Sequence, residues 1–148
     1  MGRLNFAYES LISALNALEE AIDNFENFKN SKNKLAFEFM NNEALSKTFR
    51  DSLIQRFEFC SDLFWKYLKK YLDEIVKTPS EINGPGPVIR VACKAKIISE
   101  LDAEVFLEMI KSRNLTSHIY KEEVADQISV SIPGYCKLMK KYTEKLIQ

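Results

Sequence analysis

Residues 43–76, EALSKTFRDSLIQRFEFCSDLFWKYLKKYLDEIV, decide the fold that the sequence predicts. Apolar side chains recur three or four residues apart along this stretch, a spacing that places them on one face of an α-helix. A helix of this length spans about 50 Å, since each residue adds ~1.5 Å. Its apolar stripe consists of Leu45, Phe49, Leu53, Phe57, Cys60, Phe64, Tyr67 or Leu68, Tyr71 and Ile75. One helix cannot bury such a stripe alone, so we expect other helices to pack against it.

A second apolar strip on the same stretch makes this helix either the central element or part of a subunit interface. The strip is formed by Ile54, Phe59, Trp65 and Leu72, and it widens the apolar face beyond what one neighbouring helix would cover. We therefore place Trp65 in the core or in a dimer interface.

Four charged residues interrupt the apolar stretch, and two interpretations stay open for them. Arg50, Asp51, Arg56 and Glu58 can form ion pairs with residues three or four positions away on the helix, which contributes about 0.2–0.5 kcal/mol per pair. Alternatively, Arg56 or Glu58 faces inward and supports the chemistry of the segment described below.

The flanking sequence predicts further helices on both sides of the long one. Apolar residues at helical spacing indicate a helix over residues 4–29, and the short apolar run at residues 35–40 is interpreted as a connector that lies on the bundle. Three prolines and two glycines in residues 78–87 end the long helix. We expect a plain loop there, followed by a third helix that has Pro87 in its first turn and Gly86 as its cap.

Two more helices complete the predicted fold. Asp102 is a suitable N-cap for a fourth helix that runs into Arg113. A fifth helix is expected from about residue 121 to residue 146, with a kink or break near Ser131, because Pro133 lacks the backbone N–H that a helix interior needs. The fold class is therefore all-α, an antiparallel up-and-down bundle of four to five helices.

Length and composition indicate one globular domain that spans residues 1–148. The chain is 46% hydrophobic and 28% charged, with four glycines and four prolines, which argues against disorder or a fibrous repeat. Its 21 basic and 21 acidic residues balance, so phosphate chemistry must be local. No stretch reaches the ~20 apolar residues of a membrane span. We expect a cytoplasmic protein without a membrane contact.

The cysteines and the C-terminal lysines have simple interpretations. Cys60, Cys93 and Cys136 are far apart and odd in number, so we expect reduced thiols in the core. The four lysines between residues 137 and 145 form either a solvated face that complements the helix dipole or an RNA-binding strip.

Residues 113–120, RNLTSHIY, concentrate the reactive side chains of the chain. Asn114, Thr116, Ser117 and His118 are mediocre helix formers, so we expect the fourth helix to loosen or stop here. Histidine as a residue type can exchange protons near neutral pH, while arginine keeps its charge and offers a fork that matches phosphate oxygens. The two residues suit phosphodiester cleavage, with His118 transferring a proton and Arg113 stabilising charge on phosphorus.

The spacing of this pair imposes a geometric condition. On a straight helix, Arg113 and His118 point about 140° apart, since each residue turns the chain by ~100°. They act on one phosphate only if the helix breaks between them or a second subunit supplies the partner residue. The alternative is that His118 lies on the surface or caps a helix end. A single histidine without a cysteine pair or carboxylate triad at ligand spacing predicts no metal site, and we expect no cofactor.

The same segment resembles the HEPN-domain motif, in which arginine is followed by four to six residues and then histidine, with asparagine directly after the arginine. It is similar to the longer Arg-x4-His-x-Tyr form of HepT-like toxins. Residues 51–59, DSLIQRFEF, and 63–69, LFWKYLK, resemble the long second helix of the nucleotidyltransferase substrate-binding family. The stretches PVIR (87–90) and LEMI (107–110) extend the resemblance, which covers about residues 45 to 147 in order.

The resemblance implies a dimeric HEPN-like helical bundle that partners a minimal nucleotidyltransferase. In the toxin branch, two copies of the motif face each other and form a metal-independent RNase site, and the partner silences it by adding AMP to the motif tyrosine. Applied to this sequence, the resemblance implies that Arg113 and His118 are catalytic and that Asn114 is an orienting residue. It also implies that Tyr120 is the AMP acceptor. The alternative reading of the family is a non-catalytic subunit that binds substrate for the transferase. Lys121 departs from the pattern, since an acidic or polar cap is expected after the tyrosine.

Overall fold

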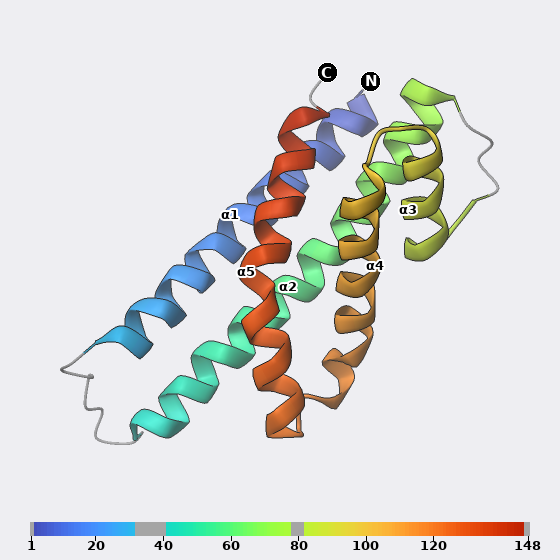
Figure 1. Cartoon of the computed structure of the whole chain (residues 1–148). Helices are drawn as coiled ribbons and strands as arrows, with labels where there is room; N and C mark the ends of the chain where they lie inside the picture. Colours follow the sequence, from blue (N-terminus) through green and yellow to red (C-terminus); the bar gives the residue numbers. More distant parts are fainter. Residues whose placement is uncertain (1, 32–40, 78–81, 147–148) are drawn as a thin grey trace.

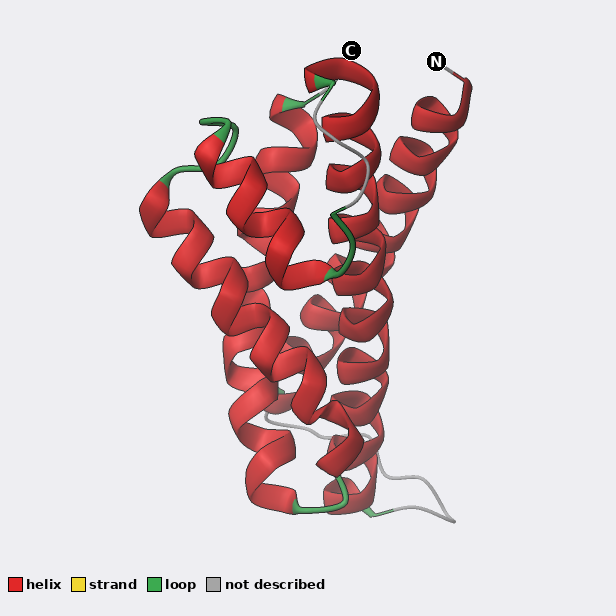
Figure 2. Cartoon of the chain, turned by 90° about the vertical axis from the view of Figure 1, so that its right-hand side faces the viewer, coloured by secondary structure: helices red, strands yellow, loops and turns green. Residues whose placement is uncertain are grey.

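The computed structural model describes residues 2–31, 41–77 and 82–146, and the regular elements in those ranges are all helical (Figures 1 and 2). Five α-helices follow one another in the described residues: α1 (Gly2–Asn30), α2 (Asn42–Tyr71), α3 (Pro85–Lys94), α4 (Glu100–Leu115) and α5 (Glu122–Lys145). A π-helical turn, η1 (Leu72–Val76), extends α2, and a 3-10 turn, η2 (Thr116–His118), extends α4. The all-α prediction is confirmed.

The long helices α1, α2, α4 and α5 alternate in direction along the chain, which is the up-and-down arrangement that the sequence predicts (Figure 1). The short α3 lies beside the C-terminal half of α2 and next to α4. Helix α2 is the central element because it contacts each of the other four α-helices. This position explains why its apolar face is wider than one neighbour requires.

The core forms around the predicted stripe of α2. Leu53, Phe57, Phe64 and Leu68 have at most 1% of their surface exposed, and Phe64 stacks on Phe106 of α4 with ring centroids 4.8 Å apart. Burial of such side chains stabilises a fold by about 1.5–3 kcal/mol each. The bundle is therefore held mainly by the face that the sequence pattern identifies.

The second apolar strip of α2 divides between core and surface. Ile54 and Leu72 are buried, Trp65 is half-buried, and Phe59 is exposed. Trp65 packs against the core without belonging to it, so one of its sides stays available. The strip is thus only partly explained by packing within one chain.

The predicted caps of two helices are wrong. Helix α3 begins at Pro85, so Pro87 lies in its first turn as predicted, but its cap is Gly84 rather than Gly86. Gly84 has a φ of +105°, a conformation that only glycine adopts without strain. Proline at the first helical position follows such a cap naturally, because its missing N–H would have no partner there.

The N-cap of α4 is Ser99 rather than Asp102. The Ser99 hydroxyl accepts a hydrogen bond from the backbone N–H of Asp102 at 3.1 Å, which satisfies one of the free donors of the first turn. The Asp102 carboxylate instead accepts a short hydrogen bond from the hydroxyl of Tyr142 in α5. The Asp102 side chain, which local sequence rules assign to the cap, therefore makes a contact between α4 and α5 instead.

We expected a kink or a break near Ser131; the break is wrong, because α5 continues through Pro133, and the kink stays a prediction. Proline in a helix interior costs about 3 kcal/mol. Burial on both sides of it opposes that cost: Ile128, Ile132 and Met139 are all buried. Packing of one continuous face against the bundle therefore outweighs the local preference.

The remaining predictions about the scaffold have mixed outcomes. The helices expected over residues 4–29 and 43–76 are confirmed. All three cysteines are free, with Cys60 and Cys136 buried and Cys93 half-buried. The connector at residues 35–40 and part of the loop at residues 78–87 lie outside the described residues. No helix among the residues described is long and apolar enough to cross a membrane.

Candidate functional site

Helix α4 changes its winding within the segment that the sequence singles out. The α-helix ends at Leu115, and Thr116–His118 form a 3-10 turn. Hydroxyl groups favour this change because they hydrogen-bond backbone carbonyls of the last turn: Thr116 Oγ1 donates to the Arg113 carbonyl at 2.7 Å, and Ser117 Oγ donates to the Asn114 carbonyl at 3.3 Å. The predicted loosening between Arg113 and His118 is confirmed.

Arg113 is held by a carboxylate of α2. Its Nε and Nη2 atoms donate to the two oxygens of Asp62, each at 3.0 Å, in a bidentate arrangement. Its Nη1 donates to Thr116 Oγ1 at 3.0 Å and lies 3.4 Å from a carboxylate oxygen of Glu58. The hydrogen bond to Asp62 is the main reason that the pKa of Arg113 is raised. Arg113 is therefore a fixed cation, with 30% of its side chain exposed.

The two residues proposed to support the segment behave differently. Glu58 reaches Arg113, as just described, whereas the guanidinium of Arg56 donates to the carbonyl of Ala17 in α1 at 2.7 Å. The structure thus brings Glu58 to the segment and does not bring Arg56 there. Asp62 is a site residue that the sequence reasoning missed. A signal was available, because Asp62 follows Glu58 by four residues and so shares its helix face.

His118 and Tyr120 lie side by side on the surface at the turn between α4 and α5. Their ring centroids are 6.0 Å apart, both side chains are exposed, and Tyr120 has 73% of its surface accessible. Lys121 Nζ lies 5.9 Å from the Tyr120 ring centroid, a distance at which a cation interacts with an aromatic face. Asn114 is exposed at the end of α4. Imidazole and phenol are both open to a large ligand.

A buried arginine fixes the start of α5, directly after this turn. Arg50 is only 4% exposed and donates to Glu122 at 2.7 Å and to Asp126 at 3.1 Å. Its hydrogen bond is the main cause of the lowered pKa of Glu122. Lys121 stands at the N-cap position without a side-chain cap. The Arg50 contacts therefore tie down a helix start that lacks a capping side chain.

The charges of α2 do not form the local pairs that we considered first. Arg50 contacts α5 and its neighbour Asp51, Arg56 contacts α1, and Glu58 contacts Arg113. Each therefore joins α2 to another part of the chain or to the adjacent residue. The interpretation as i,i+3 or i,i+4 pairs is wrong.

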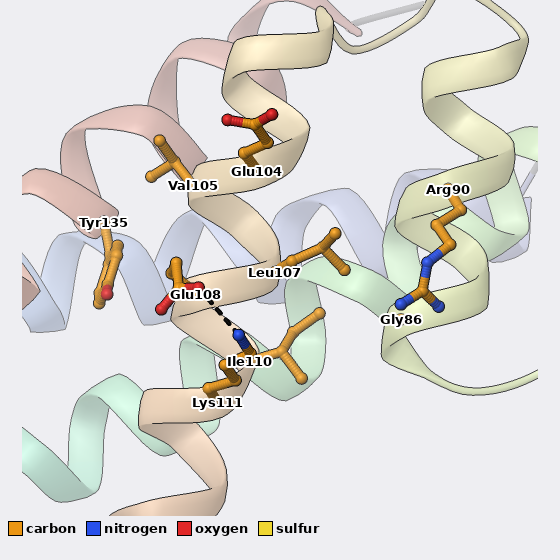
Figure 3. A pocket seen from close by; sticks show the side chains of 9 residues that line it. All are labelled: Gly86, Arg90, Glu104, Val105, Leu107, Glu108, Ile110, Lys111 and Tyr135. Atoms are coloured by element: carbon orange, nitrogen blue, oxygen red, sulfur yellow. Dashed lines mark hydrogen bonds and ion pairs between the residues drawn. The ribbon is translucent and has the colours of Figure 1, made fainter.

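Two of the hollows that adjoin α4 differ in their relation to the segment. The larger, about 680 Å³, runs along the outer side of α4 between Arg90 and Tyr135 and includes the Glu108–Lys111 pair (Figure 3). It contains no residue of the segment. The smaller, about 390 Å³, lies between α2 and the end of α4 and is lined by Arg113 and Asn114. We consider the smaller hollow the candidate binding site because it borders the reactive side chains.

Among the residues that the structure describes, no three histidine, cysteine, aspartate or glutamate side chains gather where they could hold a metal ion. The prediction of a site built from arginine, histidine and tyrosine chemistry therefore rests on the segment itself.

Comparison with known proteins places the chain in a family. A family model described as nucleotidyltransferase substrate binding protein like matches residues 7–148. The chain belongs to this family. The resemblance inferred from the motifs is thereby confirmed.

Solved structures agree with the substrate binding protein like fold. A protein from Thermus thermophilus is 29% identical, with a TM-score of 0.66 over 88% of this chain and 99% of its own. A Haemophilus influenzae protein, whose structure is described as revealing the fold of a substrate binding domain of a nucleotidyltransferase, is 23% identical, with a TM-score of 0.77 over 95% of this chain and 99% of its own. No curated protein matches the chain.

Proposed function

We propose that this chain is the HEPN subunit of a two-component system with a minimal nucleotidyltransferase, and that it is a metal-independent RNase toxin. The observation that carries the proposal is the pairing of exposed His118 and Tyr120 on a turn whose base is the fixed cation Arg113. The family description supports the transferase partner. The free thiols of this chain suit a cytoplasmic protein. We also propose that residues 1–148 form one domain.

The proposed reaction is transesterification within RNA. The 2′-oxygen of a ribose attacks the adjacent phosphorus, the bond from phosphorus to the 5′-oxygen breaks, and a 2′,3′-cyclic phosphate and a 5′-hydroxyl form. One His118 removes the 2′-proton or supplies the proton to the leaving oxygen. Arg113 stabilises the charge on the phosphoryl oxygens, and Asn114 orients the strand. Because one chain holds a single histidine, a homodimer would supply the second proton-transfer group.

The proposed silencing step is AMP transfer to Tyr120. Its phenolic oxygen attacks the α-phosphorus of ATP held by the nucleotidyltransferase, pyrophosphate leaves, and the phenolic proton passes to a base or to water. The exposure of Tyr120 permits this attack. The new phosphodiester carries a negative charge beside the His118 ring, 6.0 Å from the Tyr120 ring. It would occupy the place of the substrate phosphate and repel it.

The test uses the single histidine of the chain. Untagged protein should cleave RNA without added metal, and diethylpyrocarbonate should abolish cleavage, since His118 is the one imidazole that it can acylate. His118→Ala should be inactive, whereas Glu123→Ala, an exposed substitution at the start of α5, should remain active. Full cleavage by the His118→Ala protein would rule out the proposed RNase. Intact mass after co-expression with the adjacent nucleotidyltransferase should rise by one AMP, and Tyr120→Phe should prevent this.

A second candidate function is a non-catalytic subunit that binds substrate for the nucleotidyltransferase. The family description favours it, as does the offset of the Arg113 charge by Asp62 and Glu58. This function predicts a stable complex with the transferase and no cleavage of RNA by the isolated chain. A transferase assay with and without the chain separates the two functions, because only a substrate-binding subunit would lower the KM of the transferase.

A further inference from the structure

The C-terminal lysines of α5 divide between two hollows of the bundle. Lys140 donates to Glu19 of α1 at 2.7 Å, and Lys137 lines the same hollow between α1 and α5. The other two line a separate hollow of about 600 Å³ beside the loop between α3 and α4. We call it the basic hollow, after its four lysines: Lys94, Lys96, Lys141 and Lys145. The lysine strip of the sequence is thus split, and half of it joins two lysines from another part of the chain.

We propose that the basic hollow binds backbone phosphates of an RNA strand and anchors the strand away from the cleavage residues; RNA as the ligand rests on the proposed RNase function. The hollow lies at the start of α4, at the end of the bundle opposite the α4–α5 turn (Figure 1). The 16 residues of α4 set it about 24 Å from the segment that contains His118, since each residue adds ~1.5 Å. A stacked strand advances ~3.4 Å per nucleotide, so an RNA of roughly seven nucleotides or more would reach both places.

The charges of the basic hollow favour a polyanion. Its four ammonium groups meet two carboxylates, Glu100 and Asp102, in a chain whose formal net charge is zero. Asp102 is already engaged, because it lies 3.4 Å from Lys141 Nζ and accepts a hydrogen bond from the Tyr142 hydroxyl. The other three lysines of the hollow form no ion pair within the part of the chain that the structure describes. Their ammonium groups therefore remain for the phosphates of a ligand.

The Tyr142 ring positions two of these lysines. Lys141 Nζ and Lys145 Nζ lie 5.2 and 5.6 Å from its centroid, within the range in which an aromatic ring attracts an ammonium group. Only 2% of Tyr142 is exposed, so the ring is fixed in the core and offers no face on which a base could stack. The hollow therefore suits backbone phosphates, which carry no sequence information.

The backbone at Lys96 gives an independent indication. Its φ is +61°, a left-handed conformation that strains a residue with a side chain. Its N–H donates to the Cys93 carbonyl at 3.0 Å, as in the Schellman motif that ends many helices. The next N–H, of Ile97, donates to the Ala92 carbonyl at 2.9 Å and completes the motif. Glycine is the usual residue at this position, so a lysine there indicates that its side chain serves more than the turn.

An acidic surface of a partner protein is the competing occupant, and the composition of the hollow disfavours it. Interfaces between proteins are depleted in lysine and enriched in arginine and aromatic residues. The lining of the basic hollow includes four lysines and no arginine, and its one aromatic ring is buried. Lysine acts on a phosphate as a point charge, without the paired geometry that arginine offers a carboxylate. The lining thus favours RNA over an acidic protein.

The experiment measures how salt weakens RNA binding. The anisotropy of a labelled oligoribonucleotide long enough to reach both places is followed at several salt concentrations with His118→Ala protein, in which cleavage is prevented. Lys94→Gln and Lys145→Gln should each reduce the slope of log K against log salt by about 0.7. Lys137→Gln, which changes an exposed lysine of α5 outside the basic hollow, should leave the slope unchanged. Equal slopes for all the variants would overturn the proposal, as would a polyglutamate of equal charge that binds as tightly as the RNA.

Lys96→Gly separates RNA binding from folding. Glycine adopts a positive φ without strain, so this variant should unfold at an equal or higher urea concentration, yet its salt slope should also fall by about 0.7. A stably folded Lys96→Gly protein with an unchanged slope would contradict the site. In protein that keeps His118, the Lys94→Gln/Lys145→Gln double substitution should raise the KM for cleavage of the same RNA more than it changes kcat. Absence of all cleavage would refute the proposed RNase, whereas the salt slopes test the anchoring site, so the two failures are distinguishable.

Discussion

The ion pair between Asp62 and Arg113 should contribute measurably to stability, and a double-mutant cycle can isolate its contribution. The perturbations are Asp62→Ala, Arg113→Ala and the double substitution. Each single change removes the bidentate contact, in which two donor–acceptor distances are 3.0 Å. The cycle subtracts the other losses of each substitution, including the Arg113 contact with Thr116.

The expected coupling free energy of Asp62 and Arg113 follows from the partial burial of the pair. The side chains of Arg113 and Asp62 are 30% and 39% exposed, so the pair lies between an exposed pair, worth about 0.2–1 kcal/mol, and a buried pair, whose disruption costs about 3–5 kcal/mol. Charge-assisted bidentate geometry favours the upper part of the gap. We expect a coupling free energy of about 1–2 kcal/mol. In a domain of this size, Asp62→Ala should then lower the Tm by about 3–6 °C.

Urea unfolding of the four proteins, followed by circular dichroism, gives the free energies of unfolding. The matched control is the Glu108–Lys111 pair, which also has a distance of 3.0 Å but is 63% and 71% exposed. Its coupling should not exceed about 0.5 kcal/mol. A coupling for Asp62 and Arg113 below about 0.3 kcal/mol, or one equal to the control, would refute the view that this pair holds α4 on α2.

Three further predictions concern the scaffold. Arg50→Ala should lower the free energy of unfolding by about 2 kcal/mol in urea titrations, because it removes a buried side chain whose charge-assisted hydrogen bonds hold the start of α5. The pKa of Asp102 is lowered mainly by the Tyr142 hydroxyl. The stability that Asp102 contributes is therefore present above the ordinary aspartate pKa and is lost as the pH falls. In Tyr142→Phe protein, unfolding curves should show less of this loss between about pH 5 and 3. Half-buried Cys93 should react first with a disulfide reagent in native protein, and the two buried thiols, whose pKa burial raises to about 12 and about 11, only on unfolding.

Helix positions follow from the sequence because periodicity reports burial directly. The stripe of α2 matches its buried face, and the ends of α1 and α2 lie within a few residues of the predicted ones. The starts of α3 and α4 were less predictable, since several residues near each start can act as caps. Asp102 was a sound choice locally, but the Tyr142 hydroxyl, 40 residues away in the chain, binds its carboxylate.

Pro133 shows how packing can override a local rule. The sequence predicts an interruption there, and a peptide of α5 alone would be expected to break. In the bundle, the face that includes Ile128 and Met139 is buried on both sides of the proline. The free energy of that burial depends on α1, α2 and α4, so it could not be estimated from the α5 sequence.

The reactive members of the candidate site were predictable, and their partners were not. Arg113 and His118 stand out because their segment concentrates reactive side chains and holds the one histidine of the chain. Asp62 precedes Arg113 by 51 residues, and its one signal in the sequence is the helix face that it shares with Glu58. A partner at such a separation is identified only when the packing of α4 on α2 is known.

That packing also determines what Arg113 can do. A guanidinium has five N–H donors, and the hydrogen bonds to Asp62 and Thr116 use three of them. Glu58 lies 3.4 Å from Nη1, so the second N–H of Nη2 is the donor that these contacts leave for a phosphate. A side chain already fixed in place loses less conformational entropy when it binds. Asp62 also offsets part of the positive charge of Arg113. The ion pair therefore positions the guanidinium more than it strengthens the attraction of a phosphate. The coupling free energy of the cycle therefore measures how firmly the residue beside the proposed scissile phosphate is preorganised.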